Sequence, residues 1–247
     1  MLIAALAFQI LHLGPPAVDP QNREAIVKKL GLKRPRPVLT AEELKAHPKV
    51  LIEGPRDKKT LALTFDDGPH GDKTLTLMKL LLQLKVPASF FVVGKMLDSN
   101  KDVVKQLVRN GFTIENHTWD HPCLVALDGP HIDLEFKKTS QRIYELTGRR
   151  PVFCRPSGGQ FDVKTLEEAT ADNLITALWT DDPGDYALKD ADVLFDRLVR
   201  QAHPGGVVLL HDGVPLTWKV LPKFVKAMRA KGYRFVPLSD YRTRKRV

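Results

Sequence analysis

The chain has 247 residues, of which 43% are hydrophobic, enough to bury the core of one α/β domain. Its formal net charge of +9 comes from the two ends: residues 1–59 hold 11 Lys and Arg against 6 Asp and Glu, residues 60–240 hold 23 of each class, and residues 241–247 hold 4 basic residues and no acidic one. Enzymes of nucleic acids need positive charge along the binding groove, so this distribution argues against that class.

The first residues, MLIAALAFQILHL, form an apolar run shorter than the ~20 residues that span a bilayer. No Lys or Arg precedes Arg23, whereas a secretory signal begins with positive charge. The run is therefore either an atypical leader or an apolar helix packed on the domain. Residues 14–59 contain prolines and mixed charge and are expected to form a loosely structured lead-in. We predict an N-terminal extension over 1–59, a catalytic domain over 60–241 and a basic tail over 242–247.

From Thr60 onward, short apolar runs of β type alternate with amphipathic helical patterns. The predicted strands are 60–65, 88–93, 112–116, 151–154, 174–179, 207–211 and 233–238. The predicted helices are 75–85, 103–111, 134–148, 163–173, 192–206 and 221–232. Strands that are separated by single helices pair in parallel through βαβ crossovers. The sequence thus predicts an α/β fold, a distorted (β/α) barrel of about seven parallel strands.

In such barrels the active site lies at the C-terminal ends of the strands. Titratable or aromatic residues follow five of the predicted strands: Asp66, Asp67, His117, His121, Arg155, Trp179, Asp185, His211 and Asp212. Each of them alone is compatible with a solvated turn, because Asp and Gly are common in turns. Their shared position at strand ends instead predicts that they converge on one barrel mouth.

The stretch TFDDGP sets two adjacent carboxylates at a strand end, where a cation, an arginine or a proton must relieve their repulsion. In HTWDH, His117 and His121 are four residues apart, so a helical turn would place both imidazoles on one face. Two imidazoles and one carboxylate are the ligands of an open catalytic Zn²⁺ site. Such a metal makes hydroxide available near neutral pH and polarises a carbonyl. This set describes hydrolysis of an amide, an ester or a phosphate.

The motifs TFDDGP, HTWDH, RPSGG, DPGDY and LLHD occur in this order between Thr60 and Tyr241. In this respect the chain resembles the polysaccharide deacetylases of the NodB-homology type, also called carbohydrate esterase family four. The resemblance implies that Asp67, His117 and His121 bind the metal, expected to be Zn²⁺ or another divalent ion such as Co²⁺ or Ni²⁺.

The resemblance also implies the catalytic roles. Asp66 would be the general base and Arg155 its partner, while Asp185 would orient His211, which protonates the leaving amine. Physical chemistry supports this division. An arginine and a dication favour the ionised form of a carboxylate, and a carboxylate raises the pKa of a histidine beside it.

For the substrate, the resemblance implies that Trp179 and Leu209 line the pocket of the acetyl methyl group and that the backbone N–H of Gly158 meets the oxyanion. The family usually has proline and tyrosine where this chain has Ser157 and Gly158, so a more open groove wall is expected here. Tyr186 replaces the usual tryptophan and keeps an aromatic wall.

The expected reaction releases acetate from N-acetylglucosamine units of a polysaccharide. HTWDHP, with Trp119 and Pro122, is similar to the version in peptidoglycan deacetylases, so peptidoglycan ranks above chitin oligomers and acetylated xylan. An inactive sugar-binding relative and a metal phosphoesterase are the alternatives. We expect an exported monomer that does not bind nucleic acid and whose basic flanks contact anionic wall polymers or are simply solvated. Cys123 and Cys154 allow one disulfide but do not require it.

Overall fold

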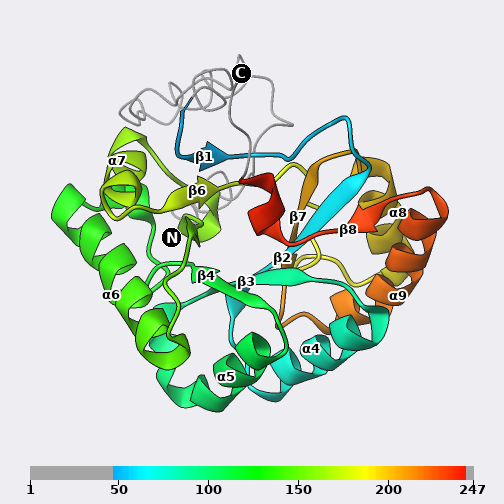
Figure 1. The fold of residues 1–247 in the computed structure, drawn as a ribbon, viewed down its shortest axis with the longest axis horizontal. Helices are drawn as coiled ribbons and strands as arrows, with labels where there is room; N and C mark the ends of the chain where they lie inside the picture. The colour runs from blue at the N-terminus through cyan, green and yellow to red at the C-terminus, as the bar shows by residue number, and fades with distance from the viewer. Residues whose placement is uncertain (1–46, 243–247) are drawn as a thin grey trace, which may run out of the picture.

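The computed structural model describes residues 47–242, so the predicted apolar leader, most of the lead-in and residues 243–247 of the basic tail lie outside the described residues. The described chain alternates between strands and helices (Figure 1). The strands are β1 (Val50–Leu51), β2 (Thr60–Gly68), β3 (Ala88–Val92), β4 (Thr113–Asn116), β5 (Phe153–Cys154), β6 (Ile175–Ala177), β7 (Gly206–His211) and β8 (Arg234–Phe235). The seven predicted strands are all present, and β1 is an additional one.

All pairings between these strands are parallel, in the order β1-β6-β5-β4-β3-β2-β7, with β8 beside the start of β2. The sheet curls until its two ends approach one another. The segment that follows β6 reaches β7, where the N–H of Leu209 donates to the carbonyl of Asp181 at 2.9 Å. Below this bridge, the N–H of Gly54 donates to Gly205. The predicted distorted (β/α) barrel is therefore confirmed.

Six α-helices of the described residues surround this sheet: α4 (Asp72–Leu84), α5 (Lys101–Arg109), α6 (Gly129–Thr147), α7 (Val163–Ala171), α8 (Ala191–Gln201) and α9 (Pro215–Ala230). They follow one another around the barrel as α7, α6, α5, α4, α9 and α8, in the order of the strands that precede them (Figure 1). Within the described residues, no helix is long and apolar enough to cross a membrane. Each crossover helix thus returns the chain to the start of the next strand.

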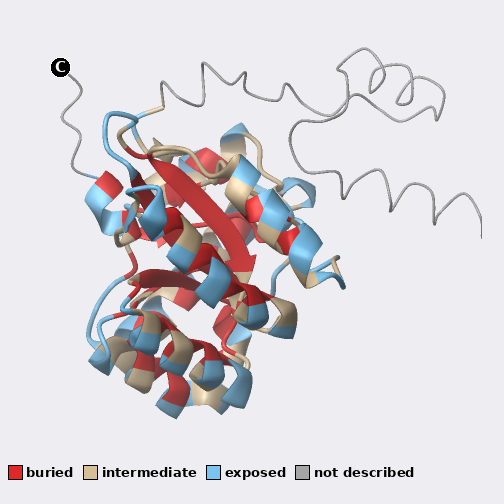
Figure 2. Ribbon diagram, turned by 90° about the vertical axis from the view of Figure 1, so that its right-hand side faces the viewer, coloured by how far each residue is buried: buried red, intermediate tan, exposed pale blue. Residues whose placement is uncertain are grey.

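The core has two layers, and β2 shows why. Its alternate residues Leu61, Leu63 and Phe65 belong to the large cluster between sheet and helices. Ala62 belongs to a smaller cluster inside the barrel, together with Phe91, Phe153, Ala177, Val207, Leu238 and Tyr241. Buried residues line both faces of the strands, as expected of a parallel sheet that is covered on both sides (Figure 2). The side chains of β2 that face inward therefore lead to the barrel mouth.

Two elements differ from the prediction. Strand β1 lies within the predicted lead-in, where a two-residue strand is too short to show any periodicity. Helix α9 begins at Pro215, six residues before the predicted start, and continues through Pro222. Proline is common in the first turn of a helix, which is why Pro222 suggested a start near that position. In the structure Pro222 instead lies inside the helix, with an exposed side chain. Both cysteines are free thiols, Cys123 exposed and Cys154 buried.

Candidate active site

Asp66 and Asp67 lie at the end of β2 and both face the barrel mouth, although alternation along a strand would send them to opposite faces. The register of β2 against β3 shifts between Phe65 and Gly68, and Asp67 adopts a left-handed conformation with φ of 70°. This conformation costs an L-residue roughly 1–2 kcal/mol, and Asp tolerates it better than most. The local distortion therefore brings both carboxylates into one site.

Asp67, His117 and His121 form the predicted metal triad. Asp67 Oδ1 lies 3.3 Å from Nε2 of each histidine, and the three ligand atoms lie within 4.8 Å of one another. His117 Nδ1 donates to the carbonyl of Arg155 at 2.8 Å, so its Nε2 presents a lone pair to the triad. Burial acts to raise the pKa of Asp67, but the two histidines hold it well below its usual range. An ionised carboxylate and two imidazoles fit a divalent transition metal.

The two histidines are held on a loop and not on a helical turn. Residues 117–121 form a loop in which Thr118 and His121 have φ of 68° and 60°. The side chain of Glu135, on α6, accepts the N–H groups of Trp119 and Asp120 at 2.7 and 2.9 Å. These two hydrogen bonds hold the loop in a conformation in which the centroids of the two imidazole rings lie 5.0 Å apart. A glutamate 14 residues beyond His121 leaves no local pattern by which the sequence could reveal it.

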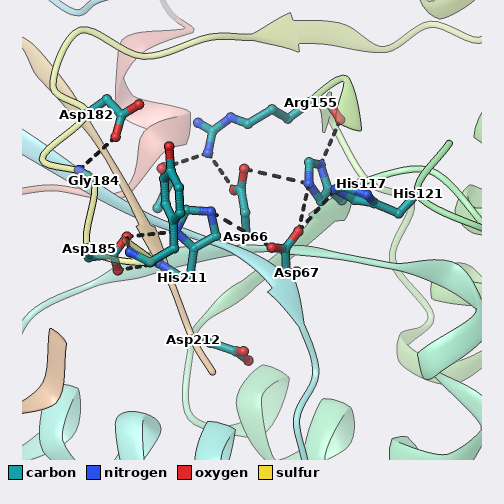
Figure 3. A network of polar contacts seen from close by, with 12 residues as sticks. Asp66, Asp67, His117, His121, Arg155, Asp182, Gly184, Asp185, His211 and Asp212 are labelled. Atoms are coloured by element: carbon teal, nitrogen blue, oxygen red, sulfur yellow. Dashed lines mark hydrogen bonds and ion pairs between the residues drawn. The ribbon is translucent and has the colours of Figure 1, made fainter. Parts of the chain in front are cut away.

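Arg155 is fully buried directly after β5 and makes the predicted contact with Asp66. Its Nη1 donates to Asp66 Oδ1 at 2.6 Å and to Thr64 Oγ1 at 2.9 Å. Its Nε donates to the carbonyl of Ala177 at the end of β6. The guanidinium thus ties β2 to β6 and occupies one oxygen of Asp66. The other oxygen, Oδ2, remains on the side of the triad, 3.8 Å from His117 Nε2 (Figure 3).

His211 and Asp185 form a second pair on the other side of Asp67. His211 Nδ1 lies 2.8 Å from Asp185 Oδ1, and Thr217 donates to Asp185 Oδ2 at 2.6 Å. Burial lowers the pKa of His211, but the hydrogen bond and charge of Asp185 outweigh it and raise the pKa to about 9. His211 is therefore a cation near neutral pH, and its Nε2 points toward the triad, 3.9 Å from Asp67 Oδ2.

Asp212 is buried and forms hydrogen bonds with residues that follow Asp66 and Asp67 in the chain, a role that the sequence did not reveal. Thr74 donates to Asp212 Oδ2 at 2.5 Å, and the ring of His70 bonds Oδ1. The approach is so close that a Cβ at Gly68 would lie 2.3 Å from Asp212 Oδ2, so only glycine fits there. These hydrogen bonds join the end of β7, which carries His211, to the turn after β2.

The four predicted substrate residues lie around this mouth. Leu209 is buried on β7, and Trp179 packs on Gly159, where a Cβ would lie 2.5 Å from the indole. Tyr186 is 60% exposed, with its ring 5.2 Å from that of His211. Gly158 has φ of 57° and no atom within 4 Å of the position of a Cβ, so the wall is open there. The structure brings these residues together, and their roles stay predictions.

A metal triad, an arginine-bound carboxylate and a cationic histidine at the C-terminal end of a (β/α) barrel define a metal-dependent hydrolase. The sequence profile described as polysaccharide deacetylase matches residues 53–176. A peptidoglycan-N-acetylglucosamine deacetylase of Bacillus cereus is 33% identical over 82% of this chain and 97% of its own length. A chitooligosaccharide deacetylase of Rhizobium leguminosarum bv. trifolii is also 33% identical, over 66% of this chain and 76% of its own.

Solved structures agree with this result. A crystal structure of a peptidoglycan N-acetylglucosamine deacetylase superimposes with a TM-score of 0.79 and 29% identity, covering 83% of this chain and 97% of the other. The chain belongs to the polysaccharide deacetylase family, whose members are hydrolases.

Proposed function

We propose that this protein removes the N-acetyl group from N-acetylglucosamine residues of peptidoglycan, with Zn²⁺ in the triad, and releases acetate. The similar proteins named as peptidoglycan N-acetylglucosamine deacetylases support the substrate. One observation carries the chemistry: the free oxygen of Asp66 lies 3.8 Å from His117 Nε2, and His211 Nε2 lies 3.9 Å from Asp67 Oδ2, so both groups approach the same triad (Figure 3). A base and an acid at one metal site are what amide hydrolysis requires.

The donor set fits the metal, because two imidazoles and one carboxylate supply three ligand atoms of the kind found in open catalytic zinc sites. When bound, Zn²⁺ makes hydroxide available near neutral pH and polarises the carbonyl of the acetyl group. Asp66 Oδ2 accepts the proton of the attacking water, because Arg155 already occupies Oδ1. In this proposal the backbone N–H of Gly158, at the open wall, donates to the developing oxyanion, a kind of contact that contributes about 10²–10³ in rate.

His211 supplies the second proton. The departing glucosamine nitrogen is a poor leaving group until it is protonated, and His211 carries a proton on Nε2 at neutral pH because Asp185 holds Nδ1. After one turnover, the amide and one water have become an amine and acetate. Leu209 and Trp179 exclude water from the acetyl methyl group.

Acetate release by the purified full chain tests the proposal. Peptidoglycan, a chitin oligomer and a phosphodiester are offered side by side, and acetate from peptidoglycan is the expected product. His211→Ala should lose far more activity on these amides than on an acetylated phenol, whose leaving group needs no proton. No acetate from any substrate, or phosphate release instead, contradicts the proposed function. Equal losses on amide and ester exclude His211 as the acid.

Because peptidoglycan lies outside the cytoplasmic membrane, the proposal includes export of the protein. Cell fractionation with an antibody against the chain tests this point. Recovery of the protein only from the cytoplasm would contradict it.

A further inference from the structure

The end of the barrel opposite the active site carries a cluster of exposed cations. We call it the basic end and define it by Lys58, Lys59, Lys85, Arg229, Lys231, Arg234 and Arg242. These residues lie before the first residues of β2 and β3, around β8, and after the last residues of α4 and α9. None of the seven forms an ion pair with another described residue.

Hydrogen bonds show that these cations share one surface. Lys59 Nζ donates to the carbonyl of Lys231, and the N–H of Arg234 donates to the carbonyl of Lys59. Arg229 Nη2 donates to the carbonyls of Leu84 and Lys85, at 2.8 and 3.1 Å. These bonds fix the guanidinium of Arg229 in place and leave its other N–H groups for a ligand. A cation that is already held in position loses less entropy on binding.

Two hollows meet at Arg234. One, of about 490 Å³, is lined by Arg229, Gly232, Tyr233, Arg234 and Phe235. The other, of about 340 Å³, is lined by Pro55, Lys58, Thr60, Arg234, Val236, Ser239, Asp240 and Tyr241. Arg234 lines both hollows, Arg229 lines one and Lys58 the other, and we call the two hollows together the groove of the basic end. Asp240 is the acidic residue in its lining.

The sequence on both sides of the described residues carries further positive charge. Arg242 directly follows Tyr241, which lines the second hollow, and Arg244, Lys245 and Arg246 come next in the sequence. At the other terminus of the domain, β1 begins at the same end of the barrel as β2, since Val50 pairs with Thr176 at the start of β6. The segment KKLGLKRPRP, residues 28–37, precedes β1 in the sequence. The described chain therefore begins and ends at or near the basic end.

We propose that the groove of the basic end binds a linear wall polymer whose units are joined by phosphodiesters, an inference that rests on the proposed action on peptidoglycan. Guanidinium groups form bidentate hydrogen bonds with phosphate oxygens. The repeating negative charges of a polymer of phosphates can each pair with one of the cations along the groove. A flat bilayer fits less well, because Tyr233 and Phe235 are only partly exposed and line the groove wall rather than projecting outward. The groove lies away from the catalytic mouth, so polymer binding leaves the active site open.

Binding of poly(glycerol phosphate) of defined length to the full chain tests this inference, measured by calorimetry at several salt concentrations. The test variant is Lys58→Glu combined with Arg234→Glu. Its matched control is Lys79→Glu with Lys105→Glu, which changes net charge equally at exposed positions on α4 and α5, outside the groove lining. We expect the test variant to bind at least about tenfold more weakly, the control to change by about twofold or less, and the wild-type affinity to fall with salt.

Both variants should unfold at the wild-type temperature and keep wild-type acetate release from a soluble chitin oligomer, so a binding loss is distinguished from misfolding and from any failure of the proposed deacetylation. Equal losses in the two variants would show that only net charge matters and would overturn the assigned groove. Vesicles of phosphatidylglycerol and phosphatidylcholine form the comparison arm. Binding to the vesicles without binding to the polymer, or no binding by the wild type, would also overturn the inference.

Discussion

At the mouth of the barrel several charged side chains are buried and paired with one another, whereas the seven cations of the basic end are exposed and form no ion pair with another described residue. Arg155 is fully buried and contacts Asp66 at 2.6 Å. Asp185 is 1% exposed and contacts His211 at 2.8 Å. Lys58 and Arg234, in contrast, are exposed. Buried charges need a fixed geometry and can do chemistry, while exposed charges contribute mainly a field.

The loops follow the same division. The loops after the strands hold mainly acidic residues: Asp98, Asp120, Asp128, Asp162, Asp181, Asp182, Asp185, Asp190 and Asp212, against Lys95, Arg155 and Lys189. The described loops before the strands are mainly basic: Lys49, Arg56, Lys58, Lys59, Lys85, Arg149, Arg150 and Lys231, against Glu53, Asp57 and Asp172. An acidic mouth attracts a metal cation and repels polyanions, which the basic end attracts instead.

The largest effect is expected from substitutions of the three metal ligands. His117→Ala, His121→Ala or Asp67→Ala each removes one of three ligands, so metal content and acetate release should fall together, the latter by about a thousandfold or more. Lys58→Glu, at the basic end, is the matched control and should keep both. Metal analysis of the dialysed proteins measures the first effect. Full zinc retention by all three alanine variants would refute the triad.

The second prediction concerns pH. Asp185 raises the pKa of His211, so deacetylation should fall as the pH rises through the pKa of this histidine and its cationic form is lost. Asp185→Asn removes the group that raises the pKa, and the alkaline limb should move toward the ordinary value of about 6.5. A pH profile of kcat for both proteins measures the shift. An unmoved limb would mean that another group titrates there.

The third prediction concerns the stability contributed by Glu115, a buried carboxyl group outside the active site. Glu115 accepts the N–H groups of Val152 and Phe153, and burial raises its pKa from 4.5 to about 7 although these bonds lower it. Between these values the folded protein holds a proton that the unfolded chain has lost, so stability falls as pH rises, by roughly 3 kcal/mol. Glu115→Gln should remove this part of the slope and leave activity intact. Denaturant unfolding at pH 5 and pH 8 compares the proteins, and parallel slopes would contradict the assignment.

The smallest effect concerns the open wall. Gly158→Tyr adds bulk where no atom lies within 4 Å, which should slow deacetylation of branched peptidoglycan a few-fold more than that of a chitin oligomer. Because φ is 57°, any side chain is strained there, so Gly158→Ala serves as the control for strain without bulk. The ratio of the two acetate rates is the readout. A ratio that changes equally in both variants, or not at all, would show that bulk at this position does not select the substrate.

The sequence predicted the mouth well because each motif places its side chain at a strand end, where the topology of a parallel barrel brings the ends together. It could not predict how the ends are shaped. Nothing local shows that Asp67 leaves the strand alternation, or that residues 117–121 form a loop held by Glu135 on another helix. These features depend on contacts between segments that are distant in the sequence.

Buried polar groups without a catalytic motif were also missed. Asp181 is 1% exposed at the seam between β6 and β7, and neither carboxylate oxygen has a hydrogen-bond partner. Its burial raises its pKa to about 6. The sequence shows only one more aspartate in an acidic loop. Whether such a residue is buried is decided by the curvature of the sheet, which periodicity does not report.

The central claim is that two adjacent aspartates have different tasks, Asp67 as metal ligand and Asp66 as base. Zinc content and acetate release of Asp66→Asn and Asp67→Asn, prepared in parallel, test it most directly, because the two isosteric changes lie one residue apart. The account predicts that Asp66→Asn keeps stoichiometric zinc and loses at least about a hundredfold in turnover, whereas Asp67→Asn loses the zinc. Loss of zinc from both variants, or full turnover by Asp66→Asn, would contradict it.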